Sequence, residues 1–144
     1  MTSEDHVATA EVEIAAPAEK VWAALTDPAR SPELWFGAEV HTDWALGSPI
    51  TWSGEWEGRR YQDRGEILAF EPDRLLRLTH FSPLSGEPDL PENHHTLAFT
   101  LSGDDATTHV VMTQDNNPSE EAALHSSGMW SQLLQTLKQV VEAS

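Results

Sequence analysis

The chain has 144 residues, and its 24 Asp and Glu residues outnumber 8 Lys and Arg, which gives a formal net charge of −16 at pH 7. This length predicts one domain spanning residues 1–144, and the charge argues against nucleic acid or an anionic membrane surface as a partner. There is no cysteine for disulfide or thiolate chemistry, and no run approaches the roughly 18 apolar residues of a membrane-spanning helix.

The N-terminal segment MTSEDHVATAEVEI carries acidic residues where a signal peptide would have a basic region and an apolar core. Together with the lack of cysteine, this favours a cytoplasmic location. Within the segment, Val7–Ile14 predicts the first strand, because Val12 and Ile14 share one side and Glu11 and Glu13 share the other.

Two short helices in series are predicted next. The first begins near Pro17, which suits the first turn of a helix, and it carries Trp22 on its apolar side. Asp27-Pro28 ends this helix, and Ser31-Pro32 begins a second one that leads into Trp35. We expect Trp22, Trp35 and the adjacent Phe36 to close one end of the space between a sheet and a helix.

Six strands separated by turns are predicted between Ala38 and Asp115. The turns are marked by clusters of Gly, Pro, Asp and Ser, and the segments between them are rich in apolar and β-branched residues. The predicted strands are Glu39–Thr42, Pro49–Glu55, Arg60–Phe70, Arg74–Ser82, His94–Leu101 and Thr108–Gln114.

A long helix is predicted to close the chain. Asn117-Pro118-Ser119-Glu120 is typical of a helix start, and Gly128 is expected to interrupt the helix. From Trp130 to Val141 one apolar stripe runs along it. A mostly antiparallel seven-stranded sheet curved around this helix would bury the stripe, so the fold class is α+β with a helix-grip arrangement.

The whole pattern resembles a known family. The residues that carry the resemblance are IAAPAEKVWAALTDP, Trp35-Phe36, Asp43, Gly47, Gly65-Glu66-Ile67, Pro72, Arg74-Leu75, Thr108, Trp130, Leu134, Leu137 and Lys138. In order and spacing they resemble the single-domain proteins similar to the activator of the 90-kDa heat-shock chaperone ATPase. Those proteins belong to the START-like, polyketide-cyclase-like and Bet v-like helix-grip superfamily.

The resemblance implies a cavity between the sheet and the long helix, often suited to apolar small molecules, and no shared set of catalytic residues. The chain departs from the family at Gly128-Met129-Trp130, where the family commonly has Gly directly before Trp. It also departs at Thr79-His80, where a Trp often ends the strand. The wall of the cavity is therefore expected to differ here.

The strand register predicts a pair of histidines on the inner face of the sheet. If the strands on either side of the loop 83–92 pair symmetrically, Leu78 faces Leu97 and His80 faces His95. The apolar partners agree with this register. The turn at Glu71–Asp73 does not determine which residues of the preceding strand lie on the same face as His80.

Extending the same logic across the next turn pairs Leu97 with Met112 and His95 with Gln114. A polar row of His80, His95 and Gln114 then ends an apolar face, where it could orient a ligand's carbonyl or hydroxyl group. The alternatives are that the row lies at the solvent-exposed rim of the sheet, or that a bulge breaks the register.

The candidate ligand-binding residues combine this row with an apolar wall. The wall is expected to contain Trp22, Trp52, Leu78, Leu97, Phe99, Trp130 and Leu134, with His80, His95 and Gln114 as orienting groups. No metal is expected, because two histidines and an amide fall short of the ligands that zinc usually takes. The glycines form no phosphate loop, so no cofactor is expected.

No catalytic residue is assigned from the sequence. Either Asp63 or Arg64 could neighbour His80, but so many carboxylates make a chance pairing with a histidine expected. The expected function is therefore binding of an apolar or aromatic small molecule, with no protein partner identified. The alternatives are a cyclase, aromatase or hydrolase-like enzyme using the same cavity, or a chaperone-associated protein whose acidic surface meets a basic partner.

Overall fold

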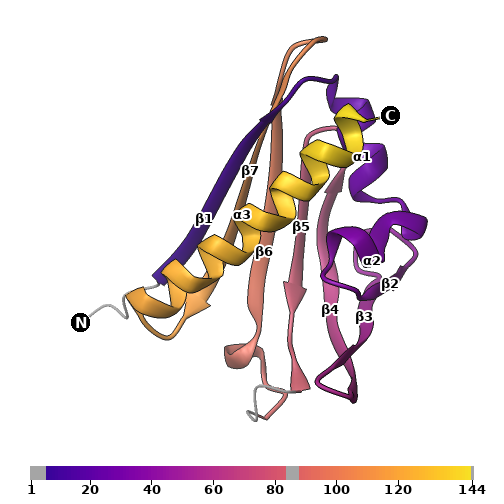
Figure 1. Ribbon diagram of the computed structural model, residues 1–144. Helices are drawn as coiled ribbons and strands as arrows, with labels where there is room; N and C mark the ends of the chain where they lie inside the picture. Colours follow the sequence, from indigo (N-terminus) through magenta and orange to yellow (C-terminus); the bar gives the residue numbers. More distant parts are fainter. Residues whose placement is uncertain (1–5, 84–87, 144) are drawn as a thin grey trace.

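A long C-terminal helix crosses one face of a seven-stranded sheet (Figure 1). The computed structural model describes residues 6–83 and 88–143. In chain order the elements are β1 (His6–Ile14), α1 (Ala18–Leu25), a 3-10 turn (Pro28–Arg30), α2 (Ser31–Leu34), β2 (Glu39–Thr42), β3 (Pro49–Trp56), β4 (Arg59–Glu71), β5 (Leu75–His80), a 3-10 turn (Pro91–Asn93), β6 (His95–Gly103), β7 (Thr108–Asn117) and α3 (Glu120–Glu142). The strand order is β1-β7-β6-β5-β4-β3-β2, and every neighbouring pair is antiparallel. The predicted α+β helix-grip fold is confirmed.

The inner strands show which register predictions hold. The predicted pairing of β5 with β6 is confirmed, since Leu78 pairs with Leu97 and His80 with His95. The predicted pairing of β6 with β7 is wrong by two residues, because Leu97 pairs with Gln114 rather than with Met112. Gln114 therefore stays on the predicted face but lies one row away from His95.

The turn between β6 and β7 explains the shift in register. β6 continues to Gly103, so the turn is shorter than the sequence suggests. The carboxylate of Asp104 accepts hydrogen bonds from the backbone N–H groups of Ala106 and Thr107, at 2.9 and 2.8 Å. This local side-chain bonding closes a tight turn and sets the pairing of the two strands.

The helix α3 is continuous, which corrects the expected interruption at Gly128. Gly128 is exposed, and packing of the apolar stripe against the sheet outweighs the modest helix penalty of one glycine. The helix begins after Ser119, whose hydroxyl accepts a hydrogen bond from Ala122 N at 3.1 Å. Asn117 instead ends β7, where its side-chain amide donates to the carbonyl groups of His6 and Gln114.

The two predicted short helices are present, but their tryptophans go to different places. The Trp22 ring meets Phe70 edge-on, with centroids 5.3 Å apart. The Trp35 ring lies between Trp52 and Trp130, with centroids 5.7 and 6.0 Å away. Trp35 is thus the aromatic centre of one end of the core, whereas Trp22 packs elsewhere.

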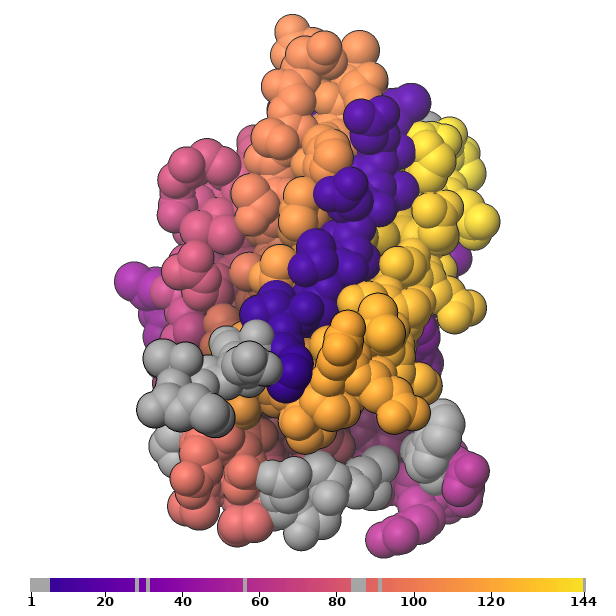
Figure 2. Space-filling view, turned by 90° about the vertical axis from the view of Figure 1, so that its left-hand side faces the viewer, coloured from indigo at the N-terminus to yellow at the C-terminus, as the bar shows by residue number. Residues whose placement is uncertain are grey.

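The far end of α3 is fastened to β1. The carboxylate of Glu142 accepts a hydrogen bond from Ala15 N at 2.9 Å, and the Lys138 ammonium donates to both Glu142 and the carbonyl of Glu13 at 2.7 Å. Figure 2 shows β1 and α3 side by side on this face, with the tip of the β6–β7 hairpin projecting beyond them. Within the described part of the chain, no helix is long and apolar enough to cross a membrane.

Candidate ligand-binding site

A pocket of about 300 Å³ lies between the first half of α3, the segment that follows α2, and the sheet. Its volume is at the lower end of the range for small-molecule sites, roughly 300–1,000 Å³. The pocket is lined by Trp35, Phe36, Ala38, Trp52, Tyr61, Asp63, His80, Ser82, Asn93, His95, Gln114, Met129 and Trp130. It therefore has an aromatic side and a polar side.

A larger hollow of about 730 Å³ lies over β2, β3 and β4, but its walls suit a ligand less well. Glu39, Glu55, Arg60 and Gln62 line it, and all of them are exposed. An apolar molecule would gain little there, because most of its surface would stay in contact with water and charged groups. We therefore take the smaller pocket as the candidate site.

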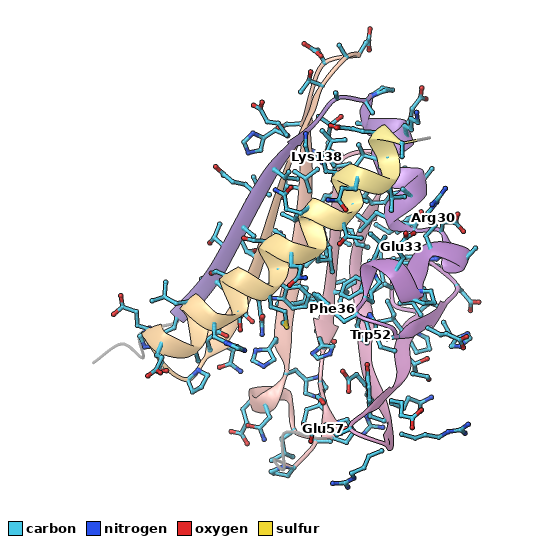
Figure 3. All side chains as sticks on the ribbon, in the orientation of Figure 1. Arg30, Glu33, Phe36, Trp52, Glu57 and Lys138 are labelled. Carbon is cyan, nitrogen blue, oxygen red and sulfur yellow. The ribbon has the colours of Figure 1, made fainter. Side chains whose placement is uncertain are left out.

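The aromatic side is built from three separate parts of the chain. Trp35 and Phe36 come from the turn that follows α2, Trp52 from β3 and Trp130 from α3. Figure 3 labels two of these side chains, Phe36 and Trp52, in the space beside α3. The Phe36 backbone has φ of 56°, which is uncommon for a residue other than glycine, and its half-exposed ring lies 6.3 Å from that of Trp130.

The turn that follows α2 holds this aromatic corner in place. Gly37 has φ of 92°, and its N–H donates to the carbonyl of Pro32 at 2.7 Å. Ala38 N donates to the carbonyl of Trp35 at 3.0 Å. Two consecutive left-handed residues reverse the chain, so that Trp35 and Phe36 both reach the pocket before β2 begins.

Asp63 and His80 form the centre of the polar side. Asp63 Oδ2 lies 2.9 Å from His80 Nε2, and the two side chains are 13% and 20% exposed. Because an ionised carboxylate only accepts hydrogen bonds, Nε2 is the donor, and Nδ1 of neutral His80 is an acceptor. The sequence left Asp63 and Arg64 open as neighbours of His80, and the structure selects Asp63.

A close approach of β4 and β5 makes this contact possible. Arg64 pairs with Phe81 and Ile67 with Leu78, which places Gly65 opposite His80. A Cβ atom on Gly65 would lie 1.8 Å from the carbonyl oxygen of Thr79, so only glycine fits here. Because Gly65 has no side chain, the carboxylate of Asp63 can reach the His80 imidazole as a diagonal cross-strand neighbour.

His95 is oriented by the backbone of β7. Its Nδ1 atom lies 2.9 Å from the carbonyl oxygen of Asp115, which can only accept a hydrogen bond. The proton of neutral His95 is therefore on Nδ1, and Nε2 is an acceptor. The rings of His80 and His95 lie 6.5 Å apart as cross-strand neighbours.

Gln114 connects the polar side to the helix. Its Oε1 atom accepts a hydrogen bond from the indole N–H of Trp130, and both side chains are buried. This bond satisfies a donor that would otherwise be buried without a partner. It also holds the Trp130 ring in place at the wall of the pocket.

Two buried polar atoms of the pocket residues have no hydrogen-bond partner among the described residues: Trp52 Nε1 and Asp63 Oδ1. Trp52 and Asp63 are directly paired across β3 and β4, so the unpaired donor and acceptor belong to neighbouring side chains. A buried polar atom left unpaired costs about 1–3 kcal/mol of stability. Such atoms are uncommon in folded proteins.

Tyr61 adds a further hydroxyl group to the polar side. Burial raises its pKa above the ordinary value, and the neighbouring Asp63 carboxylate raises it further. The phenol therefore stays protonated through the physiological range and can donate a hydrogen bond. Among the described residues, no group of three or more His, Asp or Glu side chains is placed to hold a metal ion.

The structure brings some of the sequence-predicted residues together and leaves others apart. On the pocket wall are Trp52, His80, His95, Gln114 and Trp130. In the packed core instead are Trp22, Leu78, Leu97, Phe99 and Leu134. The pocket residues that sequence reasoning did not select include Trp35 and Asp63; Trp35 was expected near this end of the core, and Asp63 was one of two candidates beside His80.

Comparison with known proteins identifies the family of the chain. The chain matches the family described as Activator of Hsp90 ATPase homolog 1-like protein over residues 15–142. No match was found among curated proteins.

Several solved structures are similar along nearly the whole chain. ChR145 from Cytophaga hutchinsonii is 44% identical with a TM-score of 0.83, over 95% of this chain and 94% of that one. MLL2253 from Mesorhizobium loti is 26% identical with a TM-score of 0.75, over 96% and 98%. The Aha1 protein from Colwellia psychrerythraea, solved as a dimer, is 21% identical with a TM-score of 0.71, over 94% and 96%. The chain therefore belongs to the Activator of Hsp90 ATPase homolog 1-like protein family.

Proposed function

We propose that the protein binds an apolar or aromatic small molecule in the pocket between α3 and the sheet. The observation that carries this proposal is the pocket itself, in which Trp35, Phe36, Trp52 and Trp130 face a short row of polar groups. Proteins of this fold commonly bind hydrophobic ligands, which supports the proposal. The lack of cysteine fits a reducing compartment, and we propose the cytoplasm as the location.

The aromatic side supplies affinity and the polar side supplies orientation. Flat rings against Trp and Phe side chains gain both from apolar burial and from ring contacts. The surrounding Leu78, Leu97 and Phe99 side chains are completely buried in the core, so the free space is confined to one end of the sheet. A volume of about 300 Å³ suits a compact molecule of few rings rather than a long lipid.

Two substitutions on α3 test this proposal. Met129 lines the pocket and is 36% exposed, so Met129→Arg should fill the entrance without disturbing the core. Leu124 is 68% exposed and is not among the pocket residues, so Leu124→Arg is the matched control. Ligand titrations followed by tryptophan fluorescence should show saturable binding in the wild type and the control, and loss of binding in Met129→Arg. Equal binding by all three proteins would overturn the proposal.

A second candidate function is an enzyme that uses the same pocket. The observation that favours it is the hydrogen bond of 2.9 Å between Asp63 and His80, which leaves Nδ1 of neutral His80 as a base at the pocket wall. A bound substrate whose turnover is lost in His80→Gln, with its affinity retained, would establish this role. Turnover that persists in His80→Gln would exclude it.

A further inference from the structure

We propose that the polar side of the pocket recognises a single hydroxyl group on an aromatic ligand, which donates a hydrogen bond to Asp63 Oδ1 and accepts one from Trp52 Nε1. This inference rests on the proposed function and adds the chemical class of the ligand. The preferred ligands are neutral hydroxyaromatic compounds, rather than aromatic carboxylates, aromatic amines or unsubstituted hydrocarbons.

The two unsatisfied atoms belong to paired residues. Trp52 and Asp63 face each other across β3 and β4, both line the pocket, and each has one buried polar atom without a partner in the described chain. One of these atoms is a donor and the other an acceptor. A hydroxyl is the smallest ligand group that can satisfy both, because it donates one hydrogen bond and accepts another.

His80 contacts both of these side chains. His80 already occupies the other carboxylate oxygen of Asp63, at 2.9 Å from Nε2. The His80 ring also meets the Trp52 ring edge-on, with centroids 4.9 Å apart. Trp52, Asp63 and His80 therefore form one cluster at the wall of the pocket.

The charge of the site selects against other polar groups. A carboxylate ligand would meet the carboxylate of Asp63 inside a chain with net charge −16. A protonated amine could donate to Asp63 but has no lone pair to accept from Trp52 Nε1. In their neutral forms, His80 Nδ1 and His95 Nε2 add two more acceptors, which again favours a ligand that donates.

Both unpaired atoms are buried, so binding must move a side chain slightly. Rotation of the Trp52 or His80 ring would open the path, and changes of this size are common when ligands bind. Shielding from bulk water then strengthens the new hydrogen bonds and increases the penalty for a ligand that cannot form them. Because of this burial, a ligand with a hydroxyl group should differ measurably in affinity from the same ligand with a hydrogen atom at that position.

Four probes with one ring system test the inference: naphthalene, 2-naphthol, 2-naphthoate and 2-naphthylmethylamine. Affinities measured by tryptophan fluorescence should place 2-naphthol first, by roughly tenfold or more over naphthalene, since it forms a hydrogen bond to a charged group. Equal affinity for naphthalene and 2-naphthol would mean that water serves the two atoms, and would overturn the inference while the proposed function stands. Tightest binding of the amine or the carboxylate would also overturn it. If none of the probes binds, the inference and the proposed function both fail.

Two substitutions test whether Asp63 and Trp52 cause the preference for 2-naphthol over naphthalene. Asp63→Asn replaces the charged acceptor with a neutral amide of the same shape, and Trp52→Phe removes the indole donor but keeps an aromatic ring. Each should weaken the preference for 2-naphthol while naphthalene still binds. Asp89→Asn is the matched control for the first, because Asp89 accepts from His94 Nε2 at 2.6 Å outside the pocket. Trp44→Phe is the control for the second, since Trp44 packs on Phe70 away from the pocket. A preference that survives both pocket substitutions would overturn the inference.

Discussion

His80 Nε2 donates a hydrogen bond to Asp63 Oδ2 across the strands β4 and β5, with 2.9 Å between the two atoms. The contact depends on Gly65, which stands opposite His80 and carries no side chain to separate the two groups. It fixes which nitrogen of the imidazole carries the proton. It also leaves the second carboxylate oxygen of Asp63 unpaired at the pocket.

The first prediction concerns the tautomer of His80. In the wild type, neutral His80 should carry its proton on Nε2, because the carboxylate of Asp63 accepts from that atom. In Asp63→Ala this preference should weaken to that of a free imidazole. Long-range proton–nitrogen NMR spectra distinguish the two tautomers, and a wild-type His80 protonated on Nδ1 would contradict the described contact.

The second prediction concerns the hydrogen bond between Trp130 and Gln114. Replacing Gln114 with Leu removes the acceptor and leaves the indole N–H buried without a partner. The free energy of unfolding should fall by about 1–3 kcal/mol, measured by urea denaturation. Gln132→Leu, at an exposed position of α3, is the control and should change stability much less. Equal effects of the two substitutions would show that this bond contributes nothing.

The third prediction compares two glycines. Gly65→Ala would place a Cβ atom 1.8 Å from the carbonyl oxygen of Thr79, so the strands must separate. The expected loss of stability is about 2 kcal/mol or more. Gly128→Ala meets nothing within 4 Å and lies inside α3, so it should raise stability by roughly 0.5–1 kcal/mol. Thermal unfolding of both variants checks the opposite signs, and a tolerated Gly65→Ala would contradict the close approach of the strands.

The fourth prediction concerns pH and Glu142. The hydrogen bond from Ala15 N, and then the contact with Lys138, hold the pKa of the Glu142 carboxyl below its ordinary value of 4.5. The folded state therefore favours the ionised form. This contribution to stability is present above the unfolded-state pKa and is lost as the pH falls through the folded-state pKa.

Glu142→Gln isolates this effect. The variant should be less stable than the wild type at neutral pH, and the difference should shrink as the pH falls to about 3. Urea midpoints at several pH values measure it, and a carboxyl NMR titration of the wild type gives the pKa directly. A constant difference across this range would rule out Glu142 as the titrating group.

The sequence allowed the fold to be predicted because each element has a strong local signal. The alternation of apolar and polar residues predicted the strands. The apolar stripe after Gly128 predicted the helix that packs on the sheet. The pairing of His80 with His95 could be predicted because apolar partners constrain both sides of that loop. The pairing of Gln114 could not be predicted. The turn at Asp104 is closed by side-chain hydrogen bonds, and the alternation of apolar and polar residues does not indicate how long that turn is.

The extent of the pocket was harder to predict for a different reason. Leu78 and Leu97 share the inner face with His80 and His95. The two-residue period of the strands therefore cannot show which of these four side chains border a pocket. Which part of that face is filled depends on side chains that arrive from other elements, above all Trp35 between the sheet and α3. Packing of this kind is set by tertiary structure and has no signature in local sequence.

The most direct test of the account follows the indole N–H signals of the protein by NMR during titration with 2-naphthol. Trp35, Trp52 and Trp130 line the pocket, whereas Trp44 lies outside it. We expect saturable shifts of the Trp35, Trp52 and Trp130 signals, the largest at Trp52, with Trp44 nearly unchanged. Shifts centred on Trp44, or no saturable shift at any tryptophan, would contradict recognition of a hydroxyaromatic ligand in this pocket.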